Sequence, residues 1–207
     1  RYKSRKDKHP PIIAICDVSG SMSRYSRMLL HFMHVLTTLR NDVHTFLFGT
    51  RLTNVTRFLR FKDVDEALAA TSSAVEDWSG GTRIGDCLKE FNFNWSRRVL
   101  GPGAIVLFIT DGLDRGGGIG LSKQIKLIQK SSKRLIWLNP LLRYEEFAPK
   151  PTGVKAILPH VDEFRPIHSL ESMDQLVNAL SETNLQSRFN MAPWLEKLSE
   201  IENAECH

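Results

Sequence analysis

Short apolar runs alternate with segments of helical periodicity along most of this chain, and this alternation constrains the fold more than any other feature. The clearest apolar runs cover residues 12–18 and 104–110, the second of which reads AIVLFIT, and residues 43–48 form a further predicted strand. Runs of this length without polar alternation are typical of strands buried on both faces of a parallel sheet. We therefore predict an α/β domain with a doubly wound, mostly parallel central sheet flanked by helices.

The remaining elements follow from the same periodicities. Residues 23–40 repeat apolar side chains at helical spacing: Tyr25, Leu29, Phe32, Leu36 and Leu39. The sequence predicts further helices at 63–75, 85–99, 120–131, 169–180 and 193–203. It predicts further strands at 54–59, as an antiparallel edge, and at 134–138 and 164–167, with a long loop before the last strand.

Composition indicates one soluble domain of ordinary to large size. The chain has 207 residues, of which 42% are hydrophobic and 25% charged. No apolar run approaches the roughly 20 residues that a membrane helix needs, so no membrane partner is expected. We predict a domain over residues 10–181 and a tail over residues 182–207 with a short amphipathic helix. That helix either packs back on its own domain or docks on another protein.

The net charge of +5 is concentrated at the start of the chain. Residues 1–8, RYKSRKDK, hold five basic side chains and one acidic side chain. Because the chain begins with Arg1, we interpret residues 1–9 as a basic arm or a linker from a possible upstream segment. Such an arm can also contact nucleic acid, but no aromatic residues are interleaved for base stacking, so nucleic-acid binding is not expected.

Three short motifs place small oxygen-bearing side chains at the ends of predicted elements: Asp17, Ser19 and Ser21 in DVSGSM, Thr82 in SGGTRIG, and Asp111 in ITDGLD. The two aspartates follow predicted buried strands, and ligands of open α/β sheets bind beyond the carboxyl ends of the strands. Hydroxyl and carboxylate oxygens suit a hard divalent cation. We predict a site for Mg²⁺, with Mn²⁺ or Ca²⁺ as alternatives.

The donor set favours binding over catalysis. Three hydroxyls and two carboxylates leave a divalent cation short of negative charge, so we expect an acidic residue of a partner protein to complete the site. Arg83, beside the metal loop, and Asp114 are candidate partner-contacting residues, although Arg83 can instead pair with Asp86 or Asp114. The alternative is a metal-dependent hydrolase or phosphatase that uses the same cation. A phosphatase of the haloacid dehalogenase type would need an aspartate where Ser19 stands.

The three motifs together resemble the metal-ion-dependent adhesion site (MIDAS) of von Willebrand factor A-like (VWA) domains. All five positions match: Asp17, Ser19, Ser21, Thr82 and Asp111. The resemblance covers roughly residues 10–181. It implies a sheet of about six strands with one antiparallel edge strand, and a partner's acidic residue that completes the metal coordination.

Longer stretches, including FLFGTRLTNVTRFLR and DWSGGTRIGDCLKEFNFNW, resemble the CoxE-like branch of VWA proteins. Members of that branch often work beside a MoxR-type AAA+ ATPase, and the named example helps to mature the metal centre of carbon monoxide dehydrogenase. The resemblance implies an adaptor, not an enzyme, whose partner is such an ATPase or its client enzyme. The sparse cysteines, Cys16, Cys87 and Cys206, suit a reducing cytoplasm.

Overall fold

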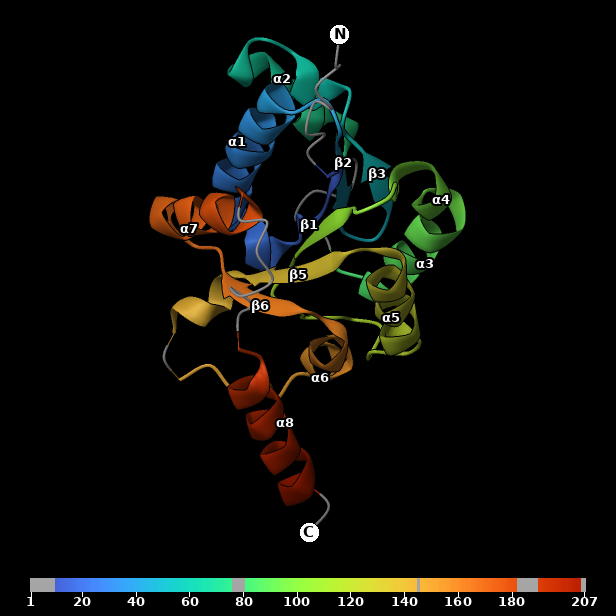
Figure 1. Cartoon of the computed structure of the whole chain (residues 1–207), viewed down its shortest axis with the longest axis vertical. Helices are drawn as coiled ribbons and strands as arrows, with labels where there is room; N and C mark the ends of the chain where they lie inside the picture. Colours follow the sequence, from blue (N-terminus) through green and yellow to red (C-terminus); the bar gives the residue numbers. More distant parts are fainter. Residues whose placement is uncertain (1–9, 76–80, 145, 182–189, 206–207) are drawn as a thin grey trace, which may run out of the picture.

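The fold is built on a six-stranded sheet with the strand order β3-β2-β1-β4-β5-β6 (Figure 1). The computed structural model describes residues 10–75, 81–144, 146–181 and 190–205. The strands are β1 Ile12–Asp17, β2 Val43–Phe48, β3 Leu52–Asn54, β4 Ile105–Ile109, β5 Arg134–Asn139 and β6 Glu163–Pro166. All neighbours pair in parallel except β2 and β3, which are antiparallel. The predicted fold class is confirmed.

Helices cover both faces of the sheet. One face carries α1 Ser23–Leu39, α2 Val64–Ala74 and α7 Leu170–Ser181. The other carries α3 Ile84–Asn94, α4 Ser96–Val99, α5 Leu121–Ser131, α6 Thr152–Ile157 and α8 Ala192–Glu205. Short 3₁₀ helices lie at η1 Gly20–Met22, η2 Phe58–Arg60, η3 Pro140–Arg143 and η4 Leu158–His160.

Strand β1 shows why its sequence is continuously apolar. Ile12, Ala14 and Cys16 belong to the core beneath α1, α2 and α7, whereas Ile13 and Ile15 belong to the core on the other face. Successive side chains of a strand point to opposite faces, so a strand covered on both sides has no solvent-facing positions. Burial also raises the pKa of the Cys16 thiol, with a smaller effect from Asp17.

Three local expectations were wrong. The edge strand ends at Asn54, because the Asn54 side chain accepts a hydrogen bond from the Thr56 amide and turns the chain. The helix expected at 85–99 is interrupted at Trp95. The expected long loop before β6 contains η3, α6 and η4. These segments are too short for their periodicity to be recognised in the sequence.

The strand order reverses beside β1. From β1 the chain goes to β2 and β3 on one side, and it then returns to β4 on the other side and continues outward to β6. Beyond the carboxyl ends of β1 and β4, the connections diverge and leave space for a ligand. Asp17 ends β1, and Asp111 follows β4 by two residues.

The C-terminal helix α8 packs on the domain. The Trp194 ring meets the Phe164 ring edge to face at a centroid distance of 5.2 Å, and Leu198 is buried in the core. Lys155 in α6 pairs with Glu205 at 2.6 Å. The basic arm at residues 1–9 and Cys206 lie outside the described residues, and the division into arm, domain and tail stays a prediction.

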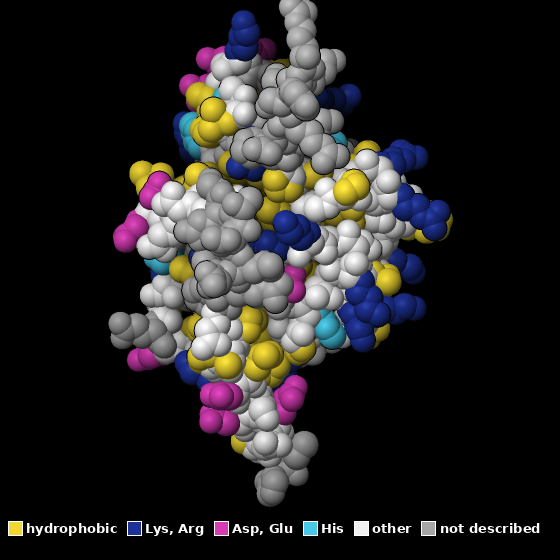
Figure 2. Space-filling model, in the orientation of Figure 1, with side chains coloured by type: hydrophobic (Ala, Val, Ile, Leu, Met, Phe, Trp, Pro, Cys, Tyr) yellow, Lys and Arg dark blue, Asp and Glu magenta, His cyan; other side chains and the backbone are white. Residues whose placement is uncertain are grey.

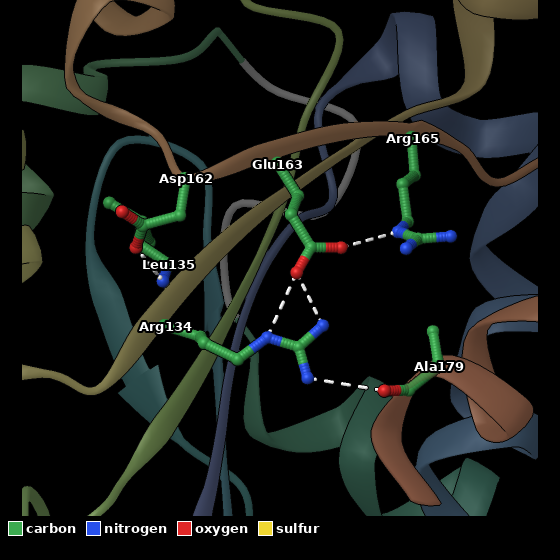
Figure 3. A network of polar contacts seen from close by, with 6 residues as sticks. All are labelled: Arg134, Leu135, Asp162, Glu163, Arg165 and Ala179. Carbon is green, nitrogen blue, oxygen red and sulfur yellow. Dashed lines mark hydrogen bonds and ion pairs between the residues drawn. The ribbon is translucent and has the colours of Figure 1, made fainter. Parts of the chain in front are cut away.

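A buried carboxylate helps to connect β5 and β6 to α7 (Figure 3). Glu163 in β6 is fully buried and accepts hydrogen bonds from two arginines. Arg134 of β5 donates through Nε at 2.9 Å and also contacts Glu163 through Nη2, while Arg165 donates through Nε at 2.6 Å. Arg134 also donates to the carbonyl of Ala179 at 3.1 Å, so one ionic network joins β5, β6 and the last turn of α7.

Candidate metal centre

The Asp17 carboxylate is buried at the end of β1 and is held by two hydrogen bonds. The Ser19 amide donates to one oxygen and the Thr110 hydroxyl to the other, both at 2.8 Å. Burial raises the pKa of Asp17 to about 6, with a smaller contribution from the charge of Asp111, although the hydrogen bonds from Ser19 and Thr110 oppose the rise. A carboxylate held in this way benefits from a nearby positive charge.

The Asp111 segment is fixed from β5. The Asp111 side chain is also buried and accepts a hydrogen bond from the Leu113 amide at 3.0 Å. Trp137 donates through Nε1 to the Thr110 carbonyl at 2.9 Å, and Asn139 donates through Nδ2 to the Asp111 carbonyl at 3.3 Å. Sequence reasoning missed Thr110, Trp137 and Asn139. Only Thr110 carried a signal, because it lies between the strand and Asp111.

The three predicted hydroxyl residues meet in one hollow of about 380 Å³. The hydroxyl oxygens of Ser19 and Ser21 lie 3.2 Å apart. Thr82 lines the same hollow and is almost fully buried, whereas Ser21 is exposed. Two different loops therefore present their hydroxyls to a space that solvent can reach.

Asp114 joins the Thr82 loop to the segment after β4. Its carboxylate accepts hydrogen bonds from the amides of Ile84 at 3.0 Å and Gly118 at 2.9 Å. The Arg115 amide donates to the Thr82 carbonyl at 3.0 Å. The Arg83 side chain is exposed at the start of α3. Roles of Arg83 and Asp114 in partner contact stay predictions, and this geometry gives Asp114 a positioning role.

Helix α6 forms a wall of the hollow through a close backbone approach. Gly112 has φ +81°, a conformation that favours glycine. A Cβ atom on Gly153, at the start of α6, would lie 2.2 Å from the Gly112 carbonyl oxygen. Only glycine at position 153 lets α6 approach the Asp111 segment this closely.

We expect Gly153→Ala to lower the free energy of unfolding by about 1–3 kcal/mol, because the added methyl group must displace backbone. Urea unfolding measures the change. Gly101→Ala is the matched control, since a Cβ at that position meets only the Pro11 ring at 3.5 Å. Equal stability of the two variants would contradict the close packing of α6 against Gly112.

Comparison with known proteins assigns the family. The family model described as "VWA domain containing CoxE-like protein" matches residues 1–173. The chain belongs to the CoxE-like VWA family. No curated protein gave a significant match.

Solved structures share the VWA fold. Proximal thread matrix protein 1 from the mussel byssus is 18% identical, with a TM-score of 0.54 over 84% of this chain and 47% of that chain. The present chain thus spans about half the length of that protein. BatB from Bacteroides thetaiotaomicron is 15% identical, with a TM-score of 0.50 over 83% of this chain and 98% of that chain. A further structure of the mussel protein, 17% identical with a TM-score of 0.53 over 84% and 47% of the two chains, has a zinc-occupied MIDAS motif.

The oxygen atoms gathered at this position fit a hard divalent cation. The hydroxyls of Ser19, Ser21 and Thr82 line the hollow, and the carboxylates of Asp17 and Asp111 are buried at the adjoining strand ends. Mg²⁺ accepts such oxygens and retains several water ligands, which buried carboxylates can orient. Within the described residues no group of three histidine, cysteine or acidic side chains is arranged for a metal. A hydroxyl-based site does not need such a group.

The described helices include none long and apolar enough to cross a lipid bilayer.

Proposed function

We propose that this CoxE-like VWA protein is a metal-dependent protein-interaction module. Asp17, Ser19, Ser21, Thr82 and Asp111 hold Mg²⁺, with Mn²⁺ or Ca²⁺ as alternatives, and an acidic residue of a partner protein binds the ion. The observation that carries the proposal is the arrangement of the oxygens. Neutral hydroxyls line the open hollow, while both carboxylates are buried and already accept hydrogen bonds from the chain.

This arrangement favours an external anion. An ion bound directly by the hydroxyls of Ser19, Ser21 and Thr82, with the Asp17 and Asp111 carboxylates acting through ligand waters, would keep positive charge on its solvent side. A carboxylate of a partner then contributes both charge and a metal–oxygen bond, and desolvation within the hollow strengthens the attraction. The metal supplies an electrophilic contact point, and the chain's own loops fix where that point lies.

Family membership suggests the kind of partner. We propose a cytoplasmic adaptor for a MoxR-type AAA+ ATPase, which acts in metalloenzyme maturation of the carbon monoxide dehydrogenase type. The acidic residue would belong to the ATPase or to its client enzyme. The match to the CoxE-like family supports this proposal.

The Ser19→Ala, Ser21→Ala double variant tests the function. We expect at least a tenfold loss of Mg²⁺ affinity in calorimetric titration, because two of the three hydroxyl donors are removed. The double variant should also recover less of a purified MoxR-type ATPase in a pull-down. With the wild type, chelator should lower the recovery in the same way. Ser72→Ala, Ser73→Ala is the matched control, since these serines are exposed on α2.

A phosphatase assay on the same proteins distinguishes a protein-interaction module from the alternative function, a metal-dependent hydrolase. Metal-dependent turnover by the wild type, lost in the Ser19, Ser21 double variant and retained in the control, would overturn the binding proposal in favour of a hydrolase. Mg²⁺ binding that is unchanged by the double variant would overturn the metal site itself.

A further inference from the structure

An apolar groove of about 610 Å³ lies between α1 and α7, away from the metal centre. From α1 it is lined by Met28, His31, Phe32, Val35, Leu36, Leu39 and Arg40, and from α7 by Leu170, Met173, Asp174, Val177 and Leu180. Helix α1 starts just after Ser19 and Ser21 and runs antiparallel to β1. Arg40 therefore lies toward the amino ends of the parallel strands, away from the candidate metal site. The Asp42 carbonyl, just after α1, accepts a hydrogen bond from the amide of Ile12 at the start of β1.

Large apolar side chains of the groove are exposed to solvent. Leu39 is 76% exposed, Leu170 is 78% exposed and Val35 is 51% exposed. Hydrophobic side chains reach the surface over α1 and α7 in the space-filling view (Figure 2). Burial of apolar area is worth about 25 cal/mol per Å², and contiguous exposed patches rimmed by polar groups mark interaction surfaces.

Arg40 gives the groove a specific chemical preference. Its Nη1 atom is buried and has no hydrogen-bond partner in the described part of the chain. A buried cationic donor without a partner carries a desolvation cost that a carboxylate can offset. Residues 23–40 contain no acidic side chain, whereas Asp174 lies on the opposite wall. The groove therefore has a basic α1 side and an acidic α7 side.

The dimensions suit a helix. The α7 wall extends from Leu170 to Leu180, which at 1.5 Å per residue is about 15 Å, or about three helical turns. Along it, Leu170, Met173, Val177 and Leu180 recur at intervals of three and four residues. Two helices with apolar rows at this spacing offer a third helix a groove for its own apolar row.

We propose that the groove between α1 and α7 docks an amphipathic helix of a partner protein. The docked helix presents apolar residues at intervals of three and four and an Asp or Glu that pairs with Arg40. This contact is separate from the metal centre, so it would persist when Mg²⁺ is removed. The protein would then engage partners at two positions, one dependent on metal and one not.

Selection from a displayed library of helices about three turns long tests the proposal. The helices are randomised on one face, selected on the full chain in chelator, and counter-selected on Leu39→Glu. We expect enriched sequences with an apolar row and an acidic residue, and at least tenfold weaker binding of the selected peptide to Leu39→Glu. Phe93→Glu is the matched control, because Phe93 is 88% exposed on α3, on the other face of the sheet.

Arg40→Gln tests the charge. This substitution should weaken binding of the acidic peptide about tenfold. The acidic peptide should then bind no more tightly than the same peptide with glutamine at the acidic position. Unfolding curves confirm that each variant is folded. Three outcomes would overturn the proposal: no binder that depends on Leu39, binders without an acidic residue, or sedimentation showing that the wild type dimerises through this groove and that Leu39→Glu is monomeric.

Discussion

Replacing Glu163 with glutamine is expected to lower the free energy of unfolding by about 3 kcal/mol. The substitution leaves Arg134 and Arg165 beside each other without the carboxylate that both contact, and removal of one member of a buried ionic network leaves an uncompensated charge. Urea unfolding measures the loss. Hydrogen exchange should also accelerate near Ala179, because Arg134 anchors the last turn of α7 through that carbonyl.

Glu205→Gln is the matched control for Glu163→Gln. Glu205 pairs with Lys155, but its side chain is 60% exposed, and exposed ion pairs contribute about 0–1 kcal/mol. A Glu163→Gln protein as stable as the Glu205→Gln protein would mean that the network in β5 and β6 contributes nothing beyond a surface pair.

Asp17→Asn is expected to weaken Mg²⁺ binding by roughly 10- to 100-fold, the range found when groups that orient metal ligands are removed. The metal-free protein should not lose stability, because burial makes the charged form of Asp17 unfavourable. A loss of metal affinity without a loss of metal-free stability is expected of a group that is retained for binding. Calorimetric titration and urea unfolding in chelator measure the two quantities.

The Asp17→Asn variant also tests how the stability of the metal-free protein depends on pH. The pKa of Asp17 is about 6 in the folded chain and 3.8 as its ordinary value, so the folded state binds a proton more tightly. The contribution of Asp17 to metal-free stability is therefore greatest below pH 4, declines as the pH rises from about 4 to 6, and is constant above that. The stability difference between wild type and Asp17→Asn should follow this course, and a difference that is flat from pH 4 to 6 would contradict it.

The fold could be predicted because its central strands β1 and β4 are buried on both faces. Residues 43–48 and 104–110 are read correctly as strands, since their lack of polar alternation leaves no solvent face. The antiparallel edge was expected, but its position was wrong, because the turn depends on one side-chain hydrogen bond from the Thr56 amide to Asn54. Helix α6 was missed, since six residues hold too few turns for a periodic signal.

The sequence predicted which side chains come together beyond β1 and β4, but it did not predict the walls around them. Ser19, Ser21 and Thr82 line one hollow, where the loop after β1 meets the segment just before α3. The walls depend on tertiary approach, and nothing local in the sequence connects Gly153 with Gly112. For the same reason, the positioning role of Asp114 is evident only from the hydrogen bonds that its carboxylate accepts from the amides of Ile84 and Gly118.

The two outermost strands have a consequence for how this protein associates. β3 has three residues and β6 has four, so each rim of the sheet offers very few unpaired backbone groups to another chain. Short rims of this kind guard against runaway strand-to-strand polymerisation. Partners are thus expected to bind to loops and helical surfaces. Exposed apolar side chains on those surfaces do not promote aggregation through strand pairing.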